Sequence, residues 1–508
     1  MFVAAPFTLL LAVVGCETPQ AEASFTVDAR IDGIETPDGE VETVQSTDPQ
    51  MCVNSAGEVF VMWMDDRLGL EREVMWMNRS LSKGDPDTWL PTASRINQGD
   101  GRVFNPQMMC DDNGVYVVWE DDRDGELENH NIYFQRSLDG ETWLPEDVRV
   151  EDDPNGLSYS VSPRITSDAN GELYVVWANN ESGSYDIRLG TSGDQGASWR
   201  DMGRVDEDGV GDAWSGRPAI AVSDDGLFVW VAWEDTRDGK SDIYFNYSQK
   251  SGGGWEGEER IDMGTNDPDG EYESFEPQVC ADGKSNVYVV WHDARGGDGY
   301  DVYYQYSANL GGTFLPTAQR LETDTPGFAN SLYPRCSANG ATLHTTWYDD
   351  RFDGYDVFYR RLTQGSPDGV EVRVDTGTPE GFANSLDAKL ARFDNTVAIA
   401  WADDRAEAEA NANTTTTGPG NTPAGYEDLY YNYTEGAAFD EETDYRIDSL
   451  LPGQSYKVGL EIALLGNELY AAWEDGRGGS SDIYFQRHLL GEQGTPPPVE
   501  GDDAQEGQ

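Results

Sequence analysis

The sequence predicts an all-β protein, an eight-bladed β-propeller of four-stranded antiparallel blades that is closed by an N-terminal strand completing the last blade. Two observations support this fold. A segment containing a tryptophan occurs eight times in the 508 residues, at intervals of 54 to 58 residues with one of 72. Around each copy, short runs rich in Val, Tyr, Trp and Ile alternate with turns rich in Gly and Asp, as strands do. Four strands per repeat in a closed ring form a propeller.

The repeated segment reads Trp-x-Asp-x-Arg in seven of its eight copies. An eighth copy, Trp177-Ala178-Asn179-Asn180-Glu181, keeps only the tryptophan. Catalysis needs one asymmetric set of groups, whereas seven equivalent copies indicate construction. We expect each Trp to pack between blades while Asp and Arg pair with each other or with neighbouring backbone. The seven copies are Trp63, Asp65 and Arg67; Trp119, Asp121 and Arg123; Trp233, Asp235 and Arg237; Trp291, Asp293 and Arg295; Trp347, Asp349 and Arg351; Trp401, Asp403 and Arg405; and Trp473, Asp475 and Arg477.

Each unit contains four predicted strands in a fixed order. In the fourth unit these are a Pro-led stretch at 218–222, an alternating run ending in the Trp at 228–233, a second run at 242–248 and a short Arg-Ile-Asp at 260–262. The short Arg strand follows each of the first seven tryptophans, and the eighth copy precedes the first Trp as Arg30-Ile31-Asp32. The N-terminal strand is therefore expected to complete the last blade. Closure protects the blade edges, and we expect a monomer.

The segments outside the repeats are assigned to export and linkage. Residues 1–15 form an apolar run too short to span a bilayer and are predicted to be a signal peptide. Val13-Val14-Gly15-Cys16 resembles a bacterial lipobox, which implies a diacylglycerol on Cys16 and a location at the outer membrane or cell surface, with membrane contact through the anchor only. Residues 16–24 are the tether and 25–490 the propeller. A low-complexity insertion at about 406–425 explains the long interval, and 491–508 is predicted to be a disordered acidic tail.

The charge of the chain restricts its partners. The formal net charge is −61, and only six of the 34 basic residues are Lys. Nucleic acid is excluded as a partner, because binding it requires basic residues that displace counterions. Cations, basic proteins and neutral glycans remain. A strongly acidic surface also keeps a protein soluble, which is the simpler interpretation of the charge.

Three turns between third and fourth strands resemble the Asp-box, Ser-x-Asp-x-Gly-x-Thr-Trp, of the sialidase-like (bacterial neuraminidase repeat) propellers. The matching residues are Ser137, Asp139 and Trp143; Ser192, Asp194, Gly196 and Trp199; and a third copy at 307–314 with Asn309 for the Asp. The resemblance covers about 25–490 and implies that the Asp-box is a turn-forming device on the face opposite the ligand face. True sialidases have six blades and an early Arg-Ile-Pro motif, whereas Arg30-Ile31-Asp32 here is one of eight strand copies.

Candidate ligand-binding residues lie in the connections from outer to inner strands, where the units differ. Arg164, Arg217 and Arg335 stand at or beside the start of inner strands and are expected to converge on a carboxylate, with Tyr272 and Glu276 nearby. Aromatic and acidic residues in these connections suit a sugar or peptide, and Asp clusters make calcium a candidate, although no EF-hand pattern occurs. No other cofactor and no defined metal site is predicted.

Four further cysteines precede their blade's Trp by nine or eleven residues. Because they fall in neighbouring blades of an exported protein, we expect disulfides Cys52–Cys110 and Cys280–Cys336, with buried free thiols as the alternative.

The sequence thus favours a non-catalytic, surface-anchored binding module that presents an acidic loop face to a glycan, protein or cation. The alternative, implied by the family resemblance, is a sialidase-like glycoside hydrolase acting on a carboxylated sugar.

Overall fold

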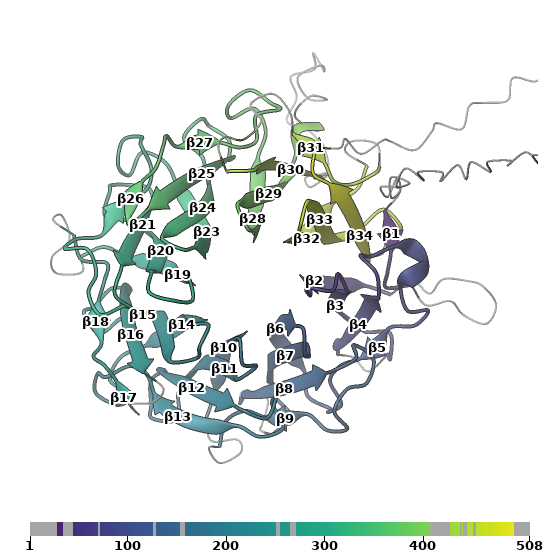
Figure 1. The fold of residues 1–508 in the computed structure, drawn as a ribbon, viewed down its shortest axis with the longest axis horizontal. Coiled ribbons are helices and arrows are strands. Elements are labelled where there is room, and N and C mark those ends of the chain that lie inside the picture. Colours follow the sequence, from purple (N-terminus) through teal and green to yellow (C-terminus); the bar gives the residue numbers. More distant parts are fainter. Residues whose placement is uncertain are drawn as a thin grey trace, which may run out of the picture.

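The computed structural model confirms the eight-bladed propeller. It describes residues 28–33, 44–69, 72–124, 129–152, 158–249, 254–264, 271–406, 408, 427–436, 439, 444–450 and 454–491. Their strands form eight antiparallel sheets arranged in a ring around an open centre (Figure 1). In each blade the first strand in the sequence lies nearest the centre, except that the last blade takes its outer strand from the N-terminal end.

The inner strands are β2 (Ser46–Val53), β6 (Val103–Asp111), β10 (Ser160–Ser167), β14 (Ser215–Val222), β19 (Ser274–Ala281), β23 (Ser331–Asn339), β28 (Ser385–Phe393) and β32 (Lys457–Leu465). The second strands are β3 (Val59–Asp65), β7 (Gly114–Asp121), β11 (Leu173–Asn179), β15 (Phe228–Asp235), β20 (Val287–Asp293), β24 (Thr342–Asp349), β29 (Thr396–Asp403) and β33 (Glu468–Asp475).

The third strands are β4 (Val74–Ser80), β8 (Asn131–Ser137), β12 (Asp186–Ser192), β16 (Asp242–Gln249), β21 (Asp301–Ser307), β25 (Asp356–Thr363), β30 (Asp428–Thr434) and β34 (Asp482–Leu489). The outer strands are β5 (Ser94–Arg95), β9 (Val148–Arg149), β13 (Arg200–Arg204), β18 (Glu259–Arg260), β22 (Gln319–Arg320), β27 (Val372–Arg373), β31 (Tyr445–Arg446) and β1 (Ala29–Arg30). Two short strands, β17 (Gly254–Trp255) and β26 (Ser366–Pro367), and a 3₁₀ turn, η1 (Pro86–Thr88), complete the described elements.

The second strands read as continuous apolar runs because neighbouring blades cover both of their faces. In β20, for example, all seven residues are buried. Each hydrophobic cluster joins two adjacent blades, such as Tyr288 and Val290 of one blade with Leu343 and Trp347 of the next. The core is therefore a ring of inter-blade layers, and removing one blade would expose two apolar faces.

Hydrogen bonds from side-chain amides to backbone carbonyls link neighbouring blades. A side-chain amide in the middle of a third strand donates to the neighbouring blade. The acceptor is the backbone carbonyl of the residue that follows the preceding blade's outer strand. Asn246 Nδ2 reaches Val205 O at 2.9 Å and Gln486 Nε2 reaches Ile447 O at 2.8 Å. Asn78 makes the same bond to Ile31 O, at 3.1 Å, across the seam between the first and last blades. The seam is thus built like every other blade boundary.

The ring closes as predicted. β1 pairs antiparallel with β34, with Ala29 opposite Phe485 and Arg30 opposite Tyr484. Asp28 adds an ion pair with Arg477 at 2.7 Å and accepts a hydrogen bond from the Ser449 N–H at 2.9 Å. Purple β1 beside yellow β34 in Figure 1 marks this closure.

The predictions for residues 1–15, for Cys16 with its tether at 16–24 and for nearly all of the insertion at 406–425 fall outside the described residues, as does the tail from 492. Among the described residues, no helix has the length and apolar character needed to cross a membrane.

Candidate functional site

The Trp-x-Asp-x-Arg turns share one hydrogen-bonded arrangement on the face formed by the second-to-third strand connections. Every tryptophan is fully buried, and in six turns its indole N–H donates to the Asp carboxylate at 2.9–3.3 Å. In all seven the arginine's backbone N–H donates to the same carboxylate at 2.7–3.0 Å. Each guanidinium pairs with that carboxylate and lies 3.7–4.5 Å from a third-strand ring. These mutually satisfied groups support a structural role.

Five of these arginines also reach a carboxylate that precedes the outer strand of the same blade. The pairs are Arg123–Asp147 at 2.7 Å, Arg405–Asp444 at 2.8 Å, Arg477–Asp28 at 2.7 Å, Arg237–Glu258 and Arg351–Glu371. One guanidinium thus bridges two carboxylates while it stacks on a ring. A lysine ammonium lacks this planar fork, which explains why these five positions are Arg.

The third blade departs from this arrangement. Asn179 occupies the Asp position and donates from Nδ2 to Ser160 Oγ at 2.8 Å and to Glu151 Oε2 at 3.3 Å. The buried indole N–H of Trp177 has no hydrogen-bond partner among the described residues. An amide network therefore replaces the ion pair in this blade.

A second ring of equivalent positions lies closer to the central opening, at the start of the inner strands. All eight inner strands shift register at the same point, and the residue there has a left-handed φ between 45° and 62°. Proline follows it in six blades. The backbone repeats but the side chains differ: Asp48, Asn105, Ser162, Arg217, Glu276, Tyr333, Asp387 and Gly459. Non-Gly residues seldom adopt this conformation, and such strain clusters at ligand sites.

Three glutamates at the first x of the Trp-x-Asp turn clamp this ring from the neighbouring blade. Glu120 accepts the Ser162 N–H at 2.8 Å, and Glu234 accepts the Glu276 N–H, also at 2.8 Å. Glu474 accepts the backbone N–H of Asp48 in the same way across the seam. The clamp holds the left-handed residue of one blade against the turn of the blade before it.

The predicted residues Arg217 and Glu276 meet at this clamp. Arg217 pairs with Glu234 at 3.2 Å and approaches Glu276 at 3.7 Å. Burial raises the pKa of Glu234 to about 7, although the Glu276 N–H and Arg217 oppose the shift. Tyr333, on the left-handed position two blades along, is 43% exposed and stacks on Tyr348 with ring centroids 5.7 Å apart. Arginine, two carboxylates and a tyrosine thus share one side of the channel mouth.

Arg164 and Arg335 lie two residues further along their inner strands, and hence deeper in the channel than Arg217. Arg164 Nη1 donates to its neighbour Pro163 O at 3.0 Å. Burial lowers the pKa of Arg164, and Arg335 lowers it further, while Glu276 raises it. The predicted trio therefore splits into two levels, with two arginines close enough to repel each other. Tyr272 is exposed and lies two residues before β19.

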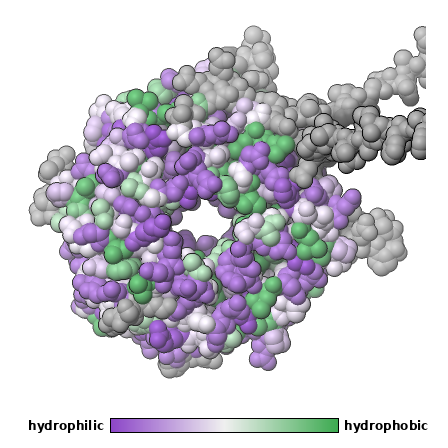
Figure 2. Space-filling view, viewed as in Figure 1, coloured by the Kyte–Doolittle hydropathy of each residue, from purple (hydrophilic) through white to green (hydrophobic). Residues whose placement is uncertain are grey.

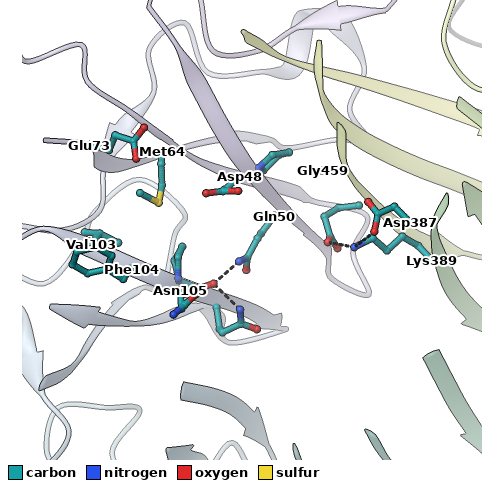
Figure 3. Close-up of a pocket in the computed structure, with 14 residues that line it drawn as sticks. Asp48, Gln50, Met64, Glu73, Val103, Phe104, Asn105, Asp387, Lys389 and Gly459 are labelled. Atoms are coloured by element: carbon teal, nitrogen blue, oxygen red, sulfur yellow. Dashed lines mark hydrogen bonds and ion pairs between the residues drawn. The ribbon is translucent and has the colours of Figure 1, made fainter. Parts of the chain in front are cut away.

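The opposite side of the channel mouth contains a pocket of about 620 Å³ between the first, second, seventh and eighth blades (Figure 3). Lys389 enters it and pairs with Glu461 at 3.1 Å and with Asp387 at 3.2 Å. Asp48 and Glu73 line the other wall, and burial together with Asp48 raises the pKa of Glu73. Figure 2 shows that hydrophilic residues border most of the opening. This side is net negative, in contrast to the arginine side.

Sequence reasoning missed Glu234, Tyr333 and Lys389. The left-handed ring did leave a signal, because Pro follows the position in six units. The clamp left none, since it joins residues of different blades.

The turns at 137–143 and 192–199 are stabilised by their aspartates. Asp139 accepts the Glu141 N–H at 2.9 Å and the Thr142 N–H at 2.6 Å, and these bonds hold the pKa of Asp139 far below its usual range. Asp194 accepts the Ser198 N–H at 2.9 Å. Both turns lie on the face away from the channel mouth described above.

The four blade cysteines form two disulfides in the structure. Cys52 is joined to Cys110, with Cα atoms 6.0 Å apart, and Cys280 to Cys336, with Cα atoms 6.2 Å apart. Each bond connects neighbouring inner strands, β2 with β6 and β19 with β23.

One group of carboxylates among the described residues has the spacing of a metal site, namely Asp186, Asp206 and Asp208. Arg204 occupies its centre and pairs with Asp206 at 2.7 Å, with Asp186 at 3.3 Å and with Asp208. A guanidinium already neutralises these ligands, so the group fits an ion-pair network better than calcium.

No protein-family model and no curated protein matches the chain. Solved structures resemble it at the level of the fold. Polysaccharide lyase Uly1 is 11% identical over 78% of this chain and 93% of its own, with a TM-score of 0.47. Hadza microbial sialidase Hz136 is 15% identical over 60% of this chain and 63% of its own, with a TM-score of 0.38. An alpha-L-arabinanase of Penicillium chrysogenum, complexed with arabinobiose, is 15% identical over 66% of this chain and 94% of its own, with a TM-score of 0.37.

Proposed function

We propose that the protein is a non-catalytic binding module whose channel mouth takes a carboxylated sugar of a glycan. The observation that carries this proposal is the placement of Arg164 and Arg335. Two guanidiniums lie in one channel in a protein of net charge −61, and burial lowers the pKa of Arg164 while repulsion by Arg335 lowers it further. A ligand carboxylate between them would relieve that repulsion through charge-assisted hydrogen bonds.

The surrounding ring favours a saccharide as the bearer of the carboxylate. Tyr333 and Tyr348 offer ring faces, and Asn105, Ser162 and Glu276 offer hydrogen-bonding groups of different kinds at equivalent heights. Sites of this type combine a few polar anchors with aromatic surface. Binding without turnover is favoured because Arg217, Glu234 and Glu276 already satisfy one another.

The direct test is a glycan array with the 17–508 protein, with and without calcium, followed by titration of any acidic glycan that binds. We expect Arg335→Gln to weaken binding by about 10- to 100-fold, the value of a charged hydrogen bond. Arg200→Gln, an exposed arginine on the outer edge of the third blade, is the matched control and should leave the affinity unchanged. Equal affinity of wild type and Arg335→Gln would contradict the proposal.

A glycoside hydrolase is the second candidate, and Glu234 is the observation that favours it. A carboxyl group with a pKa near 7 beside Arg217 and a second carboxylate is suited to donate a proton at neutral pH. A fluorogenic sialoside assay separates the candidates. Turnover that disappears in Glu234→Gln, while array binding persists, would make the protein an enzyme.

We further propose that Cys16 carries the lipid that holds this module at the outer membrane or cell surface. The resemblance of residues 13–16 to a lipobox supports it. In a bacterial host, detergent phase partitioning should place the wild-type protein in the detergent phase and Cys16→Ala in the aqueous phase. Identical partitioning would exclude a lipid on Cys16.

A further inference from the structure

The face opposite the channel mouth contains a groove of about 480 Å³ between the sixth and seventh blades. It is lined by the strand turn at Asn339 and Thr342, by His344 and Arg361 inside the sixth blade, by Asp368, and by Asn395, Glu435 and Gly436 of the seventh. These residues lie in, or at the strand ends beside, the connections between first and second, and third and fourth, strands. The groove is therefore separate from the site proposed above.

The groove lies beside the one described blade that has no Phe, Tyr or Trp at either of two paired positions of the repeat. Three residues before the repeat Trp, six blades carry a buried aromatic side chain: Phe60, Tyr116, Tyr174, Trp230, Tyr288 and Tyr470. These rings span the gap to the turns of the next blade. Tyr288, for example, donates to Ala341 O at 2.8 Å and accepts the Gly365 N–H at 3.0 Å. The sixth and seventh blades have His344 and Ala398 at this position. In the seventh blade the cross-strand partner of Ala398 is Tyr433, which packs against the core. In the sixth blade the partner of His344 is Arg361, and the gap stays open.

The wall of the groove is polar where the equivalent wall of the fifth blade is apolar. The cross-strand pair Tyr288–Tyr306 of the fifth blade corresponds to His344–Arg361 in the sixth. Two residues further along the same strands, Val290 corresponds to Thr346. Polar side chains in a blade interface lose their hydration, and this loss costs free energy unless the groups form hydrogen bonds there.

The polar atoms in this wall are incompletely paired. Arg361 donates from Nη1 to Gly436 O at 2.6 Å and pairs through Nη2 with Asp368 at 3.0 Å, yet its buried Nε has no hydrogen-bond partner among the described residues. His344 Nδ1 lies 2.7 Å from the Tyr359 hydroxyl. Burial, Arg392 and Arg361 lower the pKa of His344 to about 4, so the imidazole is neutral at physiological pH.

We propose that this groove binds a small neutral polyol, such as one sugar ring of a saccharide. Gly436 O and Asp368 take one N–H each from Nη1 and Nη2 of Arg361, which leaves further N–H donors on the same guanidinium for a ligand oxygen. The carboxylates of Asp368 and Glu435 in the same lining favour a neutral hydroxyl over a ligand carboxylate. Asp368, Glu435 and the Asn339 side-chain oxygen are acceptors for ligand hydroxyls. The negative charge of the whole protein disfavours a free anion at this face.

The matched variant restores the residue of the other blades. In the second and eighth blades a tyrosine stands opposite an arginine, as Tyr116–Arg136 and Tyr470–Arg487. His344→Tyr recreates this pair, so we expect it to fold normally while its ring fills the groove. Asp368→Ala removes a half-exposed acceptor at the rim and provides a second variant that spares the core.

The experiment is saturation-transfer NMR of the 17–508 protein with glucose, galactose, arabinose and sorbitol as probes. We expect at least one probe to bind wild type saturably, at least tenfold more weakly to His344→Tyr, and several-fold more weakly to Asp368→Ala. Arg335→Gln should leave this signal unchanged, which separates the groove from the channel site. Absence of binding to wild type, or equal binding to a folded His344→Tyr protein, would overturn the proposal.

Discussion

The Trp-x-Asp-x-Arg turns and the left-handed ring repeat around the same face of the propeller, but they vary in opposite ways. In the turns, seven copies keep the same three side chains and the same hydrogen bond from the arginine N–H to the Asp carboxylate. In the ring, eight copies keep the backbone while nearly every side chain differs. The comparison teaches that identical chemistry around a symmetric ring holds blades together, whereas recognition of an asymmetric ligand requires the symmetry to be broken.

The largest effect is expected when a turn loses its carboxylate. Asp235 accepts bonds from Trp233, Ser215 and Arg237, all buried or half-buried. Asp235→Ala leaves the guanidinium of Arg237 with one carboxylate fewer and should lower the free energy of unfolding by about 3–5 kcal/mol. Urea denaturation followed by tryptophan fluorescence measures it. Asp225→Ala, in an exposed turn of the same blade, is the control and should leave the denaturation midpoint nearly unchanged.

The disulfides test whether the repeated turns alone suffice to join blades. Cys52→Ser with Cys110→Ser opens a bridge between residues 58 positions apart. We expect a loss of about 2–4 kcal/mol, because the unfolded chain regains freedom. The same measurement on wild type under reducing conditions should show a comparable or larger loss, since both bridges then open. An unchanged denaturation midpoint would show that the interface between the first and second blades is stable without this disulfide.

The pH dependence of stability distinguishes buried carboxylates from exposed ones. Burial raises the pKa of Glu234 to about 7 and the pKa values of Asp28 and Asp482 to about 6. A carboxyl group with a raised pKa contributes stability below its unfolded pKa, near 4, and loses it as the pH rises through 6 to 7. The buried His292, His344 and His488, whose pKa values burial lowers to about 4, oppose this trend below pH 6.5. Because carboxyl groups with raised pKa values outnumber them, we expect the Tm to be higher at pH 5.5 than at pH 8 at constant ionic strength.

Glu234→Gln should flatten part of this dependence, because the amide does not titrate. Carboxylates with a lowered pKa, such as those of Asp194 and Asp235, act with the opposite sign and lose their contribution only as the pH falls below about 4. A Tm that rises steadily from pH 5.5 to pH 8 would contradict the expected sign.

The smallest effect is expected when the ring changes its side chain but keeps its backbone. Ser162 has a φ of 55°, which glycine adopts without strain, so Ser162→Gly should change the free energy of unfolding by less than about 1 kcal/mol. Gly459→Ala is the converse variant at a φ of 62°, with a new Cβ 3.0 Å from Pro49 Cδ, and should destabilise by about 1 kcal/mol or more. Equal changes in the free energy of unfolding for the two variants would contradict the expectation that the left-handed φ favours glycine at these positions.

The fold was predictable because it repeats. The eight repeats from Trp63 to Trp473 predicted eight blades. The eighth copy of the Arg strand, which precedes the first Trp at Arg30, predicted that the N-terminal strand completes the last blade. Pairing inside a blade is local, so the bonds from Asp235 to Trp233 and Arg237 follow from a spacing of two residues.

The site was less predictable because it depends on contacts between blades. Nothing in the sequence near Glu234 indicates that it accepts the Glu276 N–H, 42 residues away, or that this contact buries it. The sequence predicts that Arg164, Arg217 and Arg335 lie at the same depth in the channel, because all three stand near the start of an inner strand. The register shift before Arg164 and Arg335 separates them from Arg217, and a bulge of this kind leaves only the following proline as a trace.

The two-residue strand β1 gives the molecule a mechanical weak point. A pull on the chain at Asp28 unzips Ala29 and Arg30 from β34 one pair at a time, whereas a pull on any inner strand must shear a full-length partner. The buried ion pair of Asp28 with Arg477 directly precedes these two residue pairs, so it has to break before they separate. We therefore expect force transmitted from the N-terminal side to open the eighth blade first, while the disulfide-linked blades remain paired.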